Sequence, residues 1–394
     1  MTRPPGARRA LAVLAVAEFL GMSAWLTASA VSPELARRWA LDVEQTGWLT
    51  SIVQLGFVTG TAVVALLNLG DIWPSRRLFV GGAFLAAGAN ALLLAAPGYR
   101  AALALRFVTG LALAGVYPPA MKMIATWYES ARGFAIGVVV GALTLGKATP
   151  YLVHALARDT LAPVIVAASA GAVLAAILVL VAYRDGPFAF TRRPFSWSLV
   201  AEVVRERRWR LATAGYLGHM WELYAFWTWV AVFVAAAAAG SGRGRASADL
   251  VAYGAIGIGA IGAVWGGLVA DRIGHAKLVT IALAASGTLA LVAALLLRAS
   301  FPAFAVVTLA WGFFVIADSA QFSTLVTRSV PPHAVGTALT LQTSLGFLLT
   351  MASIQLMGVV ASRTGWPAAM AMLALGPAVG IAAVKALRRD TATR

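Results

Sequence analysis

The stretch GHMWELYAFWTW, from Gly218 to Trp229, places a carboxylate, an imidazole and four aromatic rings inside a hydrophobic run. The run continues to about residue 239, and at 1.5 Å per residue Glu222 lies roughly 16 Å along a helix from the charged end at Arg210. That depth is near the middle of a bilayer, where a charged side chain costs about 2.5 kcal/mol or more. Glu222 is therefore a candidate functional residue.

The same spacing occurs a second time, near the N-terminus. The stretch EFLGMSAW places Glu18 seven residues before Trp25, just as Glu222 stands seven residues before Trp229. Two such pairs at equivalent points of two halves of a chain indicate an internal repeat.

Composition excludes an ordinary soluble protein. Hydrophobic residues make up 60% of the 394 residues and charged residues 12%, whereas soluble domains are roughly 45–50% apolar. A span needs about 20 apolar residues. We therefore predict an all-α integral membrane protein with twelve transmembrane helices, at about 10–31, 46–68, 78–96, 101–124, 133–156, 161–183, 211–239, 249–270, 278–297, 302–326, 335–361 and 367–387.

The net charge of +16 follows the pattern of a membrane protein rather than that of a nucleic-acid-binding protein. With the N-terminus in the cytoplasm, 20 of the 31 basic residues fall on that side and eight on the other. This positive-inside bias predicts cytoplasmic N- and C-termini and leaves no need for a nucleic-acid partner. The absence of cysteine excludes disulfides, thiolate catalysis and cysteine metal sites.

The long cytoplasmic segment 184–210 divides the protein into an N-terminal six-helix bundle at 1–183 and a C-terminal one at 211–394. It contains SWSLVAEVVRERRW, in which Leu199, Val203 and Val204 share an apolar side at helical spacing. Two interpretations stay open here. The stretch is either an interfacial helix on an anionic leaflet or a solvated linker.

The stretch GGLVADRIGHAK, from Gly266 to Lys277, forms a tight predicted turn between two spans, where Asp271 can cap or face a helix N-terminus. It closely resembles the signature loop of the major facilitator superfamily, through Gly267, Asp271, Arg272, Gly274 and Lys277. The first-half copy keeps Asp71, Arg76 and Arg77 but has Leu67 and Ile72 in place of the glycine and arginine of the pattern. Arg106 and Gly110 likewise resemble the Arg-x-x-x-Gly element of the family's fourth helix.

This resemblance implies two pseudo-symmetric six-helix bundles that rock around a central site. It further implies a monomeric transporter of the bacterial inner membrane, without a cofactor, in which the first, fourth, seventh and tenth helices line the cavity. The signature loops would form a conformational gate.

Helices 4 and 5 are similar to those of bacterial members grouped with nitrate/nitrite and cyanate permeases. Nitrate itself is an unlikely substrate, because helices 2 and 8 lack the arginines that nitrate porters use. The Gly-Pro-x-x-Gly-Gly element of many drug/proton antiporters is also missing from helix 5.

Three intramembrane acids are candidates for binding the coupling proton, which we expect to be the transported ion: Glu18, Glu222 and Asp318. Such a carboxyl switches when burial favours its neutral form and a nearby cation its charged form. The alternative is that Glu18 and Glu222 are structural, each hydrogen-bonded to a neighbouring helix.

Lys147, deep in helix 5, either pairs with an acid or meets an anionic substrate, and Arg106 either contacts substrate or braces the helices. His219 either hydrogen-bonds Glu222 or only packs, whereas His154, His275 and His333 are assigned no chemistry. The candidate substrate-binding residues are Lys147, Arg106, His219, Trp221, Tyr224, Trp25, Trp311, Gln321 and Gln342.

The sequence favours a proton-driven secondary transporter over three other classes. An enzyme would need a clustered nucleophile or metal-ligand set, and a channel would need a charged ring or filter loop; neither pattern is present. A receptor that resembles a transporter has the same sequence features. Two substrate classes stay open: a small organic anion, favoured by Lys147, and an amphipathic or cationic compound exported in exchange for protons.

Overall fold

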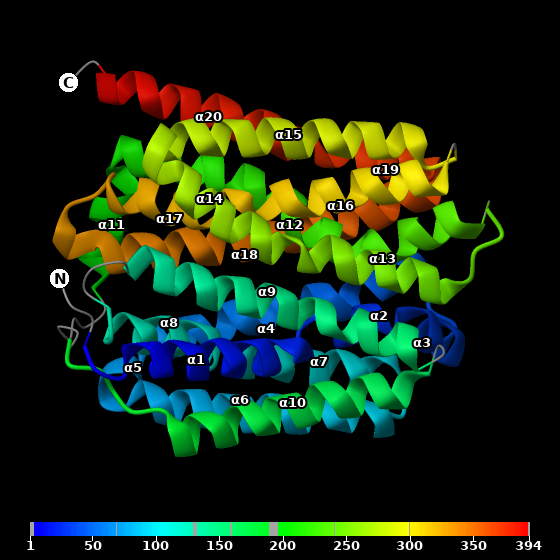
Figure 1. Ribbon diagram of the computed structural model, residues 1–394, viewed down its shortest axis with the longest axis horizontal. Coiled ribbons are helices and arrows are strands. Elements are labelled where there is room, and N and C mark those ends of the chain that lie inside the picture. The colour runs from blue at the N-terminus through cyan, green and yellow to red at the C-terminus, as the bar shows by residue number, and fades with distance from the viewer. Residues whose placement is uncertain are drawn as a thin grey trace. The chain divides into compact units, whose positions relative to one another are not determined.

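In the computed structural model every regular element is a helix within the described residues, which are 4–67, 69–128, 132–157, 160–188, 196–239, 241–298 and 300–392 (Figure 1). Within these ranges eleven helices are long and apolar enough to cross a membrane: Val43–Leu66, Ser75–Ala95, Tyr99–Ala125, Gly133–Leu156, Leu161–Ala182, Arg207–Ala239, Arg245–Ile273, His275–Leu296, Phe301–Thr327, Pro332–Thr364 and Trp366–Asp390. Their ends agree with the predicted spans to within about one helical turn. The predicted all-α membrane fold is confirmed.

The first of the twelve predicted spans is broken, and its longest piece is too short to cross a bilayer alone. It consists of α1 (Ala7–Gly21), the 3₁₀ turn η1 (Met22–Ala24) and α2 (Thr27–Ala30). Ser23 donates to the carbonyl oxygen of Leu20 at 2.7 Å. A serine that bonds back to the preceding turn in this way tends to bend its helix.

Several predicted spans are each made of two consecutive helices. The remaining elements are α3 (Ser32–Trp39), α4 (Val43–Leu66), α5 (Leu69–Ile72), α6 (Ser75–Ala91), η2 (Leu92–Ala95), α7 (Tyr99–Leu113), α8 (Tyr117–Ala125), α9 (Arg132–Leu156), α10 (Leu161–Ala182), α11 (Trp197–Arg205), α12 (Arg207–Ala239), α13 (Arg245–Gly257), α14 (Gly259–Ile273), α15 (His275–Leu296), α16 (Phe301–Ala317), α17 (Ser319–Thr327), η3 (Pro332–Ala334), α18 (Val335–Thr364), α19 (Trp366–Leu373) and α20 (Leu375–Ala392).

The contacts within the chain group it into two compact units. Unit 1 comprises residues 1–194 and 245–257, and unit 2 comprises residues 195–244 and 258–394. The span Arg245–Ile273 is thus divided, because α13 packs on α9 in unit 1 whereas α14 belongs to unit 2 (Figure 1). The sequence had assigned this whole span to the C-terminal bundle.

In each unit, glycines allow the backbones of two equivalent helices to approach closely. In unit 1 a Cβ on Gly56 of α4 would overlap the carbonyl oxygen of Phe107 on α7. In unit 2 a Cβ on Gly262 or Gly266 of α14 would overlap a carbonyl oxygen of α16. Such close backbone approach is how membrane helices pack without a hydrophobic drive. The second and fourth spans of each half are therefore paired alike, as an internal repeat requires.

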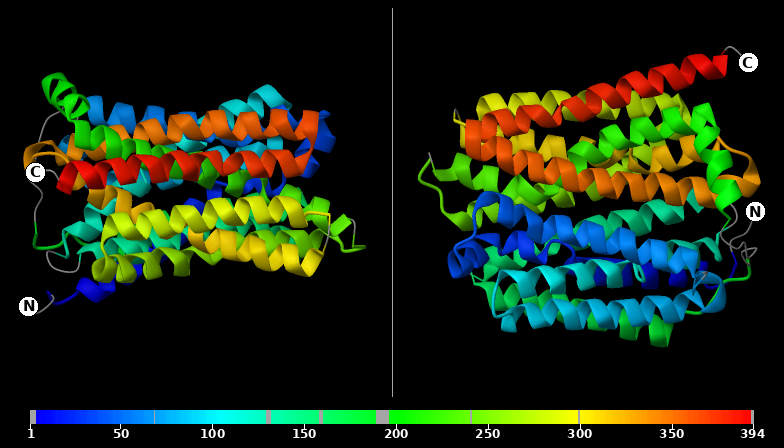
Figure 2. Two further views of the ribbon diagram at one scale, coloured as in Figure 1. Left: turned by 90° about the horizontal axis from the view of Figure 1, so that it is seen from above. Right: turned by 180° about the vertical axis from the view of Figure 1, so that it is seen from behind.

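In unit 2, α16 and α17 pack on α12. The left-hand view of Figure 2 shows α15 and α16 side by side, and the two are in contact along their length. Helices α18 and α20 pack on α12 as well.

Helix α11 forms within the predicted linker, and part of its apolar side packs against unit 2. Val203 is buried and Leu199 packs with it against the core of unit 2, while Trp197 and Val204 are exposed. Packing on α12 and α18 thus takes up part of the surface that was a candidate for membrane contact.

Candidate functional site

Unit 1 contains a buried carboxylate with no hydrogen-bond partner among the described residues. Glu18 on α1 is fully buried, and neither of its carboxylate oxygens meets a donor there. The cation that acts on it electrostatically is Lys147 of α9, itself 2% exposed. A buried ion without a compensating charge is very costly, so the two groups depend on one another.

Aromatic rings border this charge pair. The Nζ of Lys147 lies 4.0 Å from the centroid of the Trp25 ring. The Trp25 ring lies 5.1 Å from that of Phe57, which in turn lies 6.3 Å from Tyr117. Two of the candidate substrate-binding residues, Lys147 and Trp25, are therefore in contact, and rings from α4 and α8 lie next to them.

Arg106 is used by the fold itself. Its guanidinium donates to the carbonyl oxygens of Ala24, at 2.9 Å, and of Trp25, and to the Asn90 side chain at 3.2 Å. Its Nε also lies 3.4 Å from the carbonyl oxygen of Leu49. The bonds to Ala24 and Trp25 satisfy carbonyl groups at the break in the first span. The geometry supports the bracing interpretation of Arg106 rather than substrate contact.

In unit 2 the carboxylate of Glu222 is held by two donors. The hydroxyl of Ser286 on α15 donates to Oε2 at 2.8 Å, and the indole nitrogen of Trp311 on α16 donates to Oε1 at 2.7 Å. All three side chains are buried. Glu18 and Glu222 occupy equivalent sequence positions but have different surroundings, since no donor reaches Glu18 within the described part of unit 1.

His219 contacts Asp318. This contact corresponds to neither of the two alternatives that the sequence left open for His219, a hydrogen bond to Glu222 or packing alone. The Nδ1 of His219 lies 2.9 Å from Asp318 Oδ1, and both side chains are 1% exposed. Asp318 separates α16 from α17, and its backbone stays in the right-handed helical region, with φ −93° and ψ −10°. Its carboxylate reaches His219 on α12, a contact between helices that sequence spacing along one helix does not predict.

The other candidate residues of unit 2 are dispersed. Trp221 donates to the Met372 carbonyl oxygen at 3.4 Å, and Tyr224 packs its ring 5.2 Å from that of Phe347. Gln321 lies 2.7 Å from His275, a residue assigned no chemistry from the sequence. Gln342 is buried, with no partner for its amide nitrogen among the described residues.

Some buried polar residues were missed by the sequence analysis. Gln54 on α4 is fully buried, and neither atom of its amide has a hydrogen-bond partner in the described part of the chain. Asn90 joins Arg106 to α10, where it donates to Ser169 at 2.9 Å. Both amides lie within apolar runs, and a polar residue in such a run is a signal that the sequence contains. Neither amide is ionisable, and neither was among the candidate residues.

Most of the described residues of the gate motif are exposed, whereas Arg76 and Gly267 are half-buried. Gly274 has φ +92°, a conformation that favours glycine, and it joins α14 directly to α15. Asp271 lies in the last turn of α14, and α15 has no side-chain cap, so the predicted cap is absent. Arg272, Lys277 and Arg77 are exposed, and Arg76 donates to the carbonyl oxygen of Leu180. The side chain of Asp71 lies outside the described residues.

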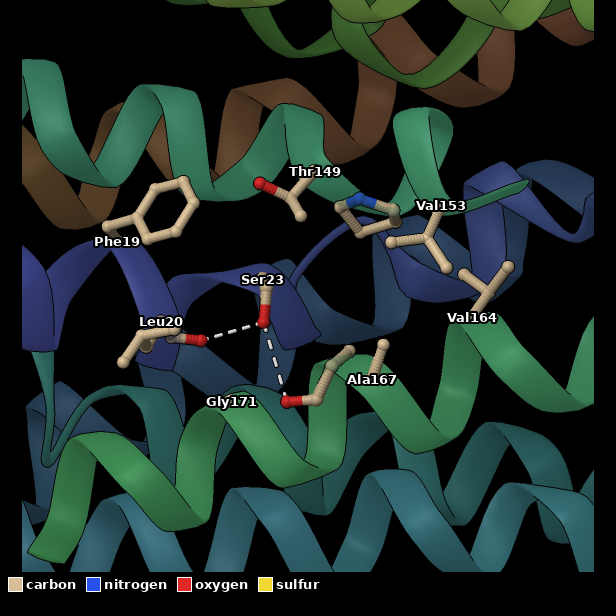
Figure 3. Close-up of a pocket in the computed structure, with 10 residues that line it drawn as sticks. Phe19, Leu20, Ser23, Thr149, Val153, Val164, Ala167 and Gly171 are labelled. Atoms are coloured by element: carbon tan, nitrogen blue, oxygen red, sulfur yellow. Dashed lines mark hydrogen bonds between the residues drawn. The ribbon is translucent and has the colours of Figure 1, made fainter. Parts of the chain in front are cut away.

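A small cavity of about 50 Å³ adjoins the break in the first span (Figure 3). Phe19, Ser23, Thr149 and Val164 are among the residues that line it. Its walls are mainly apolar, and the Ser23 hydroxyl is bonded to backbone carbonyl oxygens. It contains none of the candidate charges, so we do not assign substrate binding to it.

The fold and the buried charges define a polytopic membrane carrier made of two helical units. The chain belongs to the Major Facilitator Superfamily, whose family model matches residues 13–354. It is therefore a membrane transporter and not an enzyme.

Among individual proteins, the chain is 26% identical over 141 residues to the putative uncharacterized transporter YgaY of Escherichia coli (strain K12). The match covers 34% of each protein, so the chain spans about a third of the length of this relative.

Solved structures share the fold over nearly the whole chain. One is a bacterial homolog of the human lysosomal transporter Spinster, with a TM-score of 0.77, 14% identity and 98% of both chains covered. The nucleoside transporter NupG gives a TM-score of 0.71 at 15% identity, covering 97% of this chain and 99% of its own. The Escherichia coli fucose:proton symporter FucP gives 0.66 at 17% identity, with the same coverage.

Proposed function

We propose that the protein is a proton-coupled secondary active transporter that moves a small organic solute across a bacterial inner membrane by alternating access. The observation that carries the proposal is the buried carboxylate of Glu18, which interacts electrostatically with Lys147 and has no hydrogen-bond donor among the described residues. A carboxyl in such surroundings has two accessible states, an ion paired with the lysine and a neutral acid. Gaining and losing one proton is what coupling requires.

In this proposal Glu18 and Glu222, which occupy equivalent sequence positions, have different roles. Ser286 and Trp311 donate to the Glu222 carboxylate and hold it in place. Glu18 lacks such donors within the described residues and responds to Lys147 instead. Glu18 is therefore the first candidate for the proton carrier, and Glu222 positions α15 and α16 against α12. Asp318, paired with His219, is the second candidate for a proton site.

We propose that Lys147 and Trp25 of unit 1, and residues near His219 of unit 2, contact the substrate during the transport cycle. We further propose that the protein works as a monomer, without a cofactor, with both termini in the cytoplasm. The distribution of basic residues between the loops supports this orientation.

The first candidate substrate class is a small organic anion, such as a carboxylate. Lys147 is the buried cation available to it, and an anion that binds the ammonium would compete with Glu18 and so link binding to protonation. The resemblance to permeases for nitrate, nitrite and cyanate is in keeping with an anionic solute.

A second candidate is the export of an amphipathic or cationic compound in exchange for protons. The observation that favours it is the position of the Lys147 ammonium over the Trp25 ring. A cationic substrate can replace the lysine on that ring and on its neighbour Phe57, since both provide cation-binding faces. This mode does not need an anion site.

A ligand screen separates the two substrate classes. Purified protein is heated with diverse metabolites and drugs at two pH values, because a ligand that binds the folded state raises its melting temperature. Anions that protect wild-type protein but not Lys147→Met support the first class. Cations that protect wild-type protein but not Trp25→Leu support the second.

Transport by reconstituted protein then tests proton coupling. In proteoliposomes Glu18→Gln should lose uptake driven by a pH gradient while keeping counterflow exchange of the ligand found in the screen. Glu202→Gln, at an exposed site, is the matched control and should behave as wild type. Undiminished proton-driven uptake in both Glu18→Gln and Glu222→Gln would refute proton coupling through these residues.

A further inference from the structure

A histidine that the sequence analysis set aside lies between two carboxylates at one end of unit 1. His154 of α9 is fully buried, with Nδ1 2.9 Å from Asp249 Oδ2 on α13 and Nε2 3.2 Å from Glu34 Oε2 on α3. The side chain of Asp249 is also fully buried, and that of Glu34 is 13% exposed.

We infer that His154, Glu34 and Asp249 form a proton-binding site, separate from Glu18, whose proton holds α13 against α9 and α3. A carboxylate has no hydrogen to donate, and a neutral imidazole has a single N–H. With His154 neutral, one of its ring nitrogens therefore turns a lone pair toward a carboxylate oxygen. Both contacts become favourable together when the ring carries its second proton.

The neighbouring charges do not replace His154 as a link between helices. Arg245 lies 3.4 Å from Asp249, but both are on α13, and Arg37 lies 2.9 Å from Glu34, but both are on α3. Tyr151, one turn before His154 on α9, is a further titratable group that interacts electrostatically with Asp249 and Arg245. Each carboxylate thus keeps an arginine from its own helix when His154 loses its proton.

This arrangement lowers the free-energy cost of separating α13 from α9. Arg37 is 70% exposed and Arg245 is 23% exposed, so both arginines can follow their carboxylates into water. The two ion pairs of His154 join α9 to α13 and to α3, whereas the pairs of Arg37 and Arg245 each stay within one helix. Deprotonation of His154 therefore weakens the contacts of α9 with α3 and α13. Glu34 and Asp249 each keep an arginine partner.

The His154 site acts on a membrane span that is divided between the two units. α13 ends at Gly257 in unit 1, and α14 begins at Gly259 in unit 2, so one membrane span changes unit at this point. Glycine lowers the cost of bending a helix there. The protonation state of His154 therefore determines whether α13 stays packed on α9.

Glu34 supports the assignment of the proton to His154. Burial alone would raise the pKa of the Glu34 carboxyl, but His154 and Arg37 lower it below the ordinary value. Glu34 thus stays ionised over the range between about pH 5 and 8 in which an imidazole titrates.

Spin-label distances between α9 and α13 test the inference. The chain has no cysteine, so Leu156→Cys and Leu250→Cys, both at exposed sites, can be labelled selectively in full-length protein in lipid nanodiscs. From about pH 5 to about pH 9 the population of a longer distance should rise, by up to about tenfold per pH unit for one linked proton.

Three variants on this labelled background decide the result. His154→Gln should show the longer distance at every pH, whereas His154→Arg, with a permanent charge, should keep the short one. His333→Gln removes an exposed histidine that pairs with Glu202 in unit 2 and should keep the wild-type response. Distances that do not depend on pH in wild-type protein, or a pH response that survives in His154→Gln, would overturn the proposal. Because this readout needs no substrate, it stands or falls independently of proton coupling at Glu18.

Discussion

The ammonium of Lys147 lies 4.0 Å from the centroid of the Trp25 indole, directly after the break in the first span of unit 1. A cation over the face of tryptophan gains about 0.5–2 kcal/mol, the larger value when both are desolvated. The same lysine compensates the buried charge of Glu18. Lys147 thus interacts with both the Trp25 ring and the Glu18 carboxylate. We expect this of a cation that changes its partner during transport.

Removing this cation alone should destabilise the protein. Lys147→Met leaves the Glu18 carboxylate buried without its opposite charge, and breaking a buried pair from one side typically costs about 3–5 kcal/mol. The double variant Lys147→Met with Glu18→Gln should recover most of that loss. Unfolding of the purified proteins at neutral pH measures the effect. Destabilisations that simply add in the double variant would show that the two groups are not coupled.

Arg106 should tolerate no replacement, not even by lysine. A lysine ammonium is a single point of charge and cannot reach Ala24, Leu49 and Asn90 together, as the guanidinium does. Buried groups left without a donor cost about 1–3 kcal/mol each, so Arg106→Lys should lower the free energy of unfolding by at least that amount. Arg100→Lys, at an exposed position of the same helix, is the matched control. Equal melting temperatures for the two variants would contradict the bracing role.

The sequence predicted the spans and the buried acids because both are local properties. Hydrophobic runs of sufficient length give the helices, and Glu18 and Glu222 lie within such runs, so their burial follows. The break after Gly21 was not predictable, since it depends on carbonyl bonds to Arg106, which lies about 80 residues further along the chain. The site at His154 was missed for the same reason. Asp249 lies 95 residues away in sequence, and proximity to a helix end made the histidine look unimportant.

The depressed pKa of Glu34 predicts how stability depends on pH at the cluster of His154, Glu34 and Asp249. Because the folded-state pKa is lower than 4.5, the ionised form stabilises the protein above that pH. The contribution is lost as the pH falls through the folded-state value. Glu34→Gln should therefore melt below wild type at about pH 6, by an amount that corresponds to about 1 kcal/mol or less because the site is partly exposed. The difference should shrink toward about pH 3, whereas a constant difference across this range would point to lost packing instead.

Two adjacent glycines of α14 provide a test of helix packing in unit 2. A Cβ on Gly266 would overlap the carbonyl oxygen of Ala317 at the end of α16, whereas a Cβ on Gly267 would meet no atom within 4 Å. Backbone atoms cannot move aside as a flexible side chain can, so Gly266→Ala should force α14 and α16 apart and cost about 1–3 kcal/mol. Gly267→Ala should fold as wild type, although Gly267 is the glycine that matches the family's signature loop. Since alanine favours a helix over glycine at both positions, propensity alone would stabilise both variants. A lower melting temperature for Gly266→Ala only would establish that contact with α16, next to Asp318, sets the requirement for glycine.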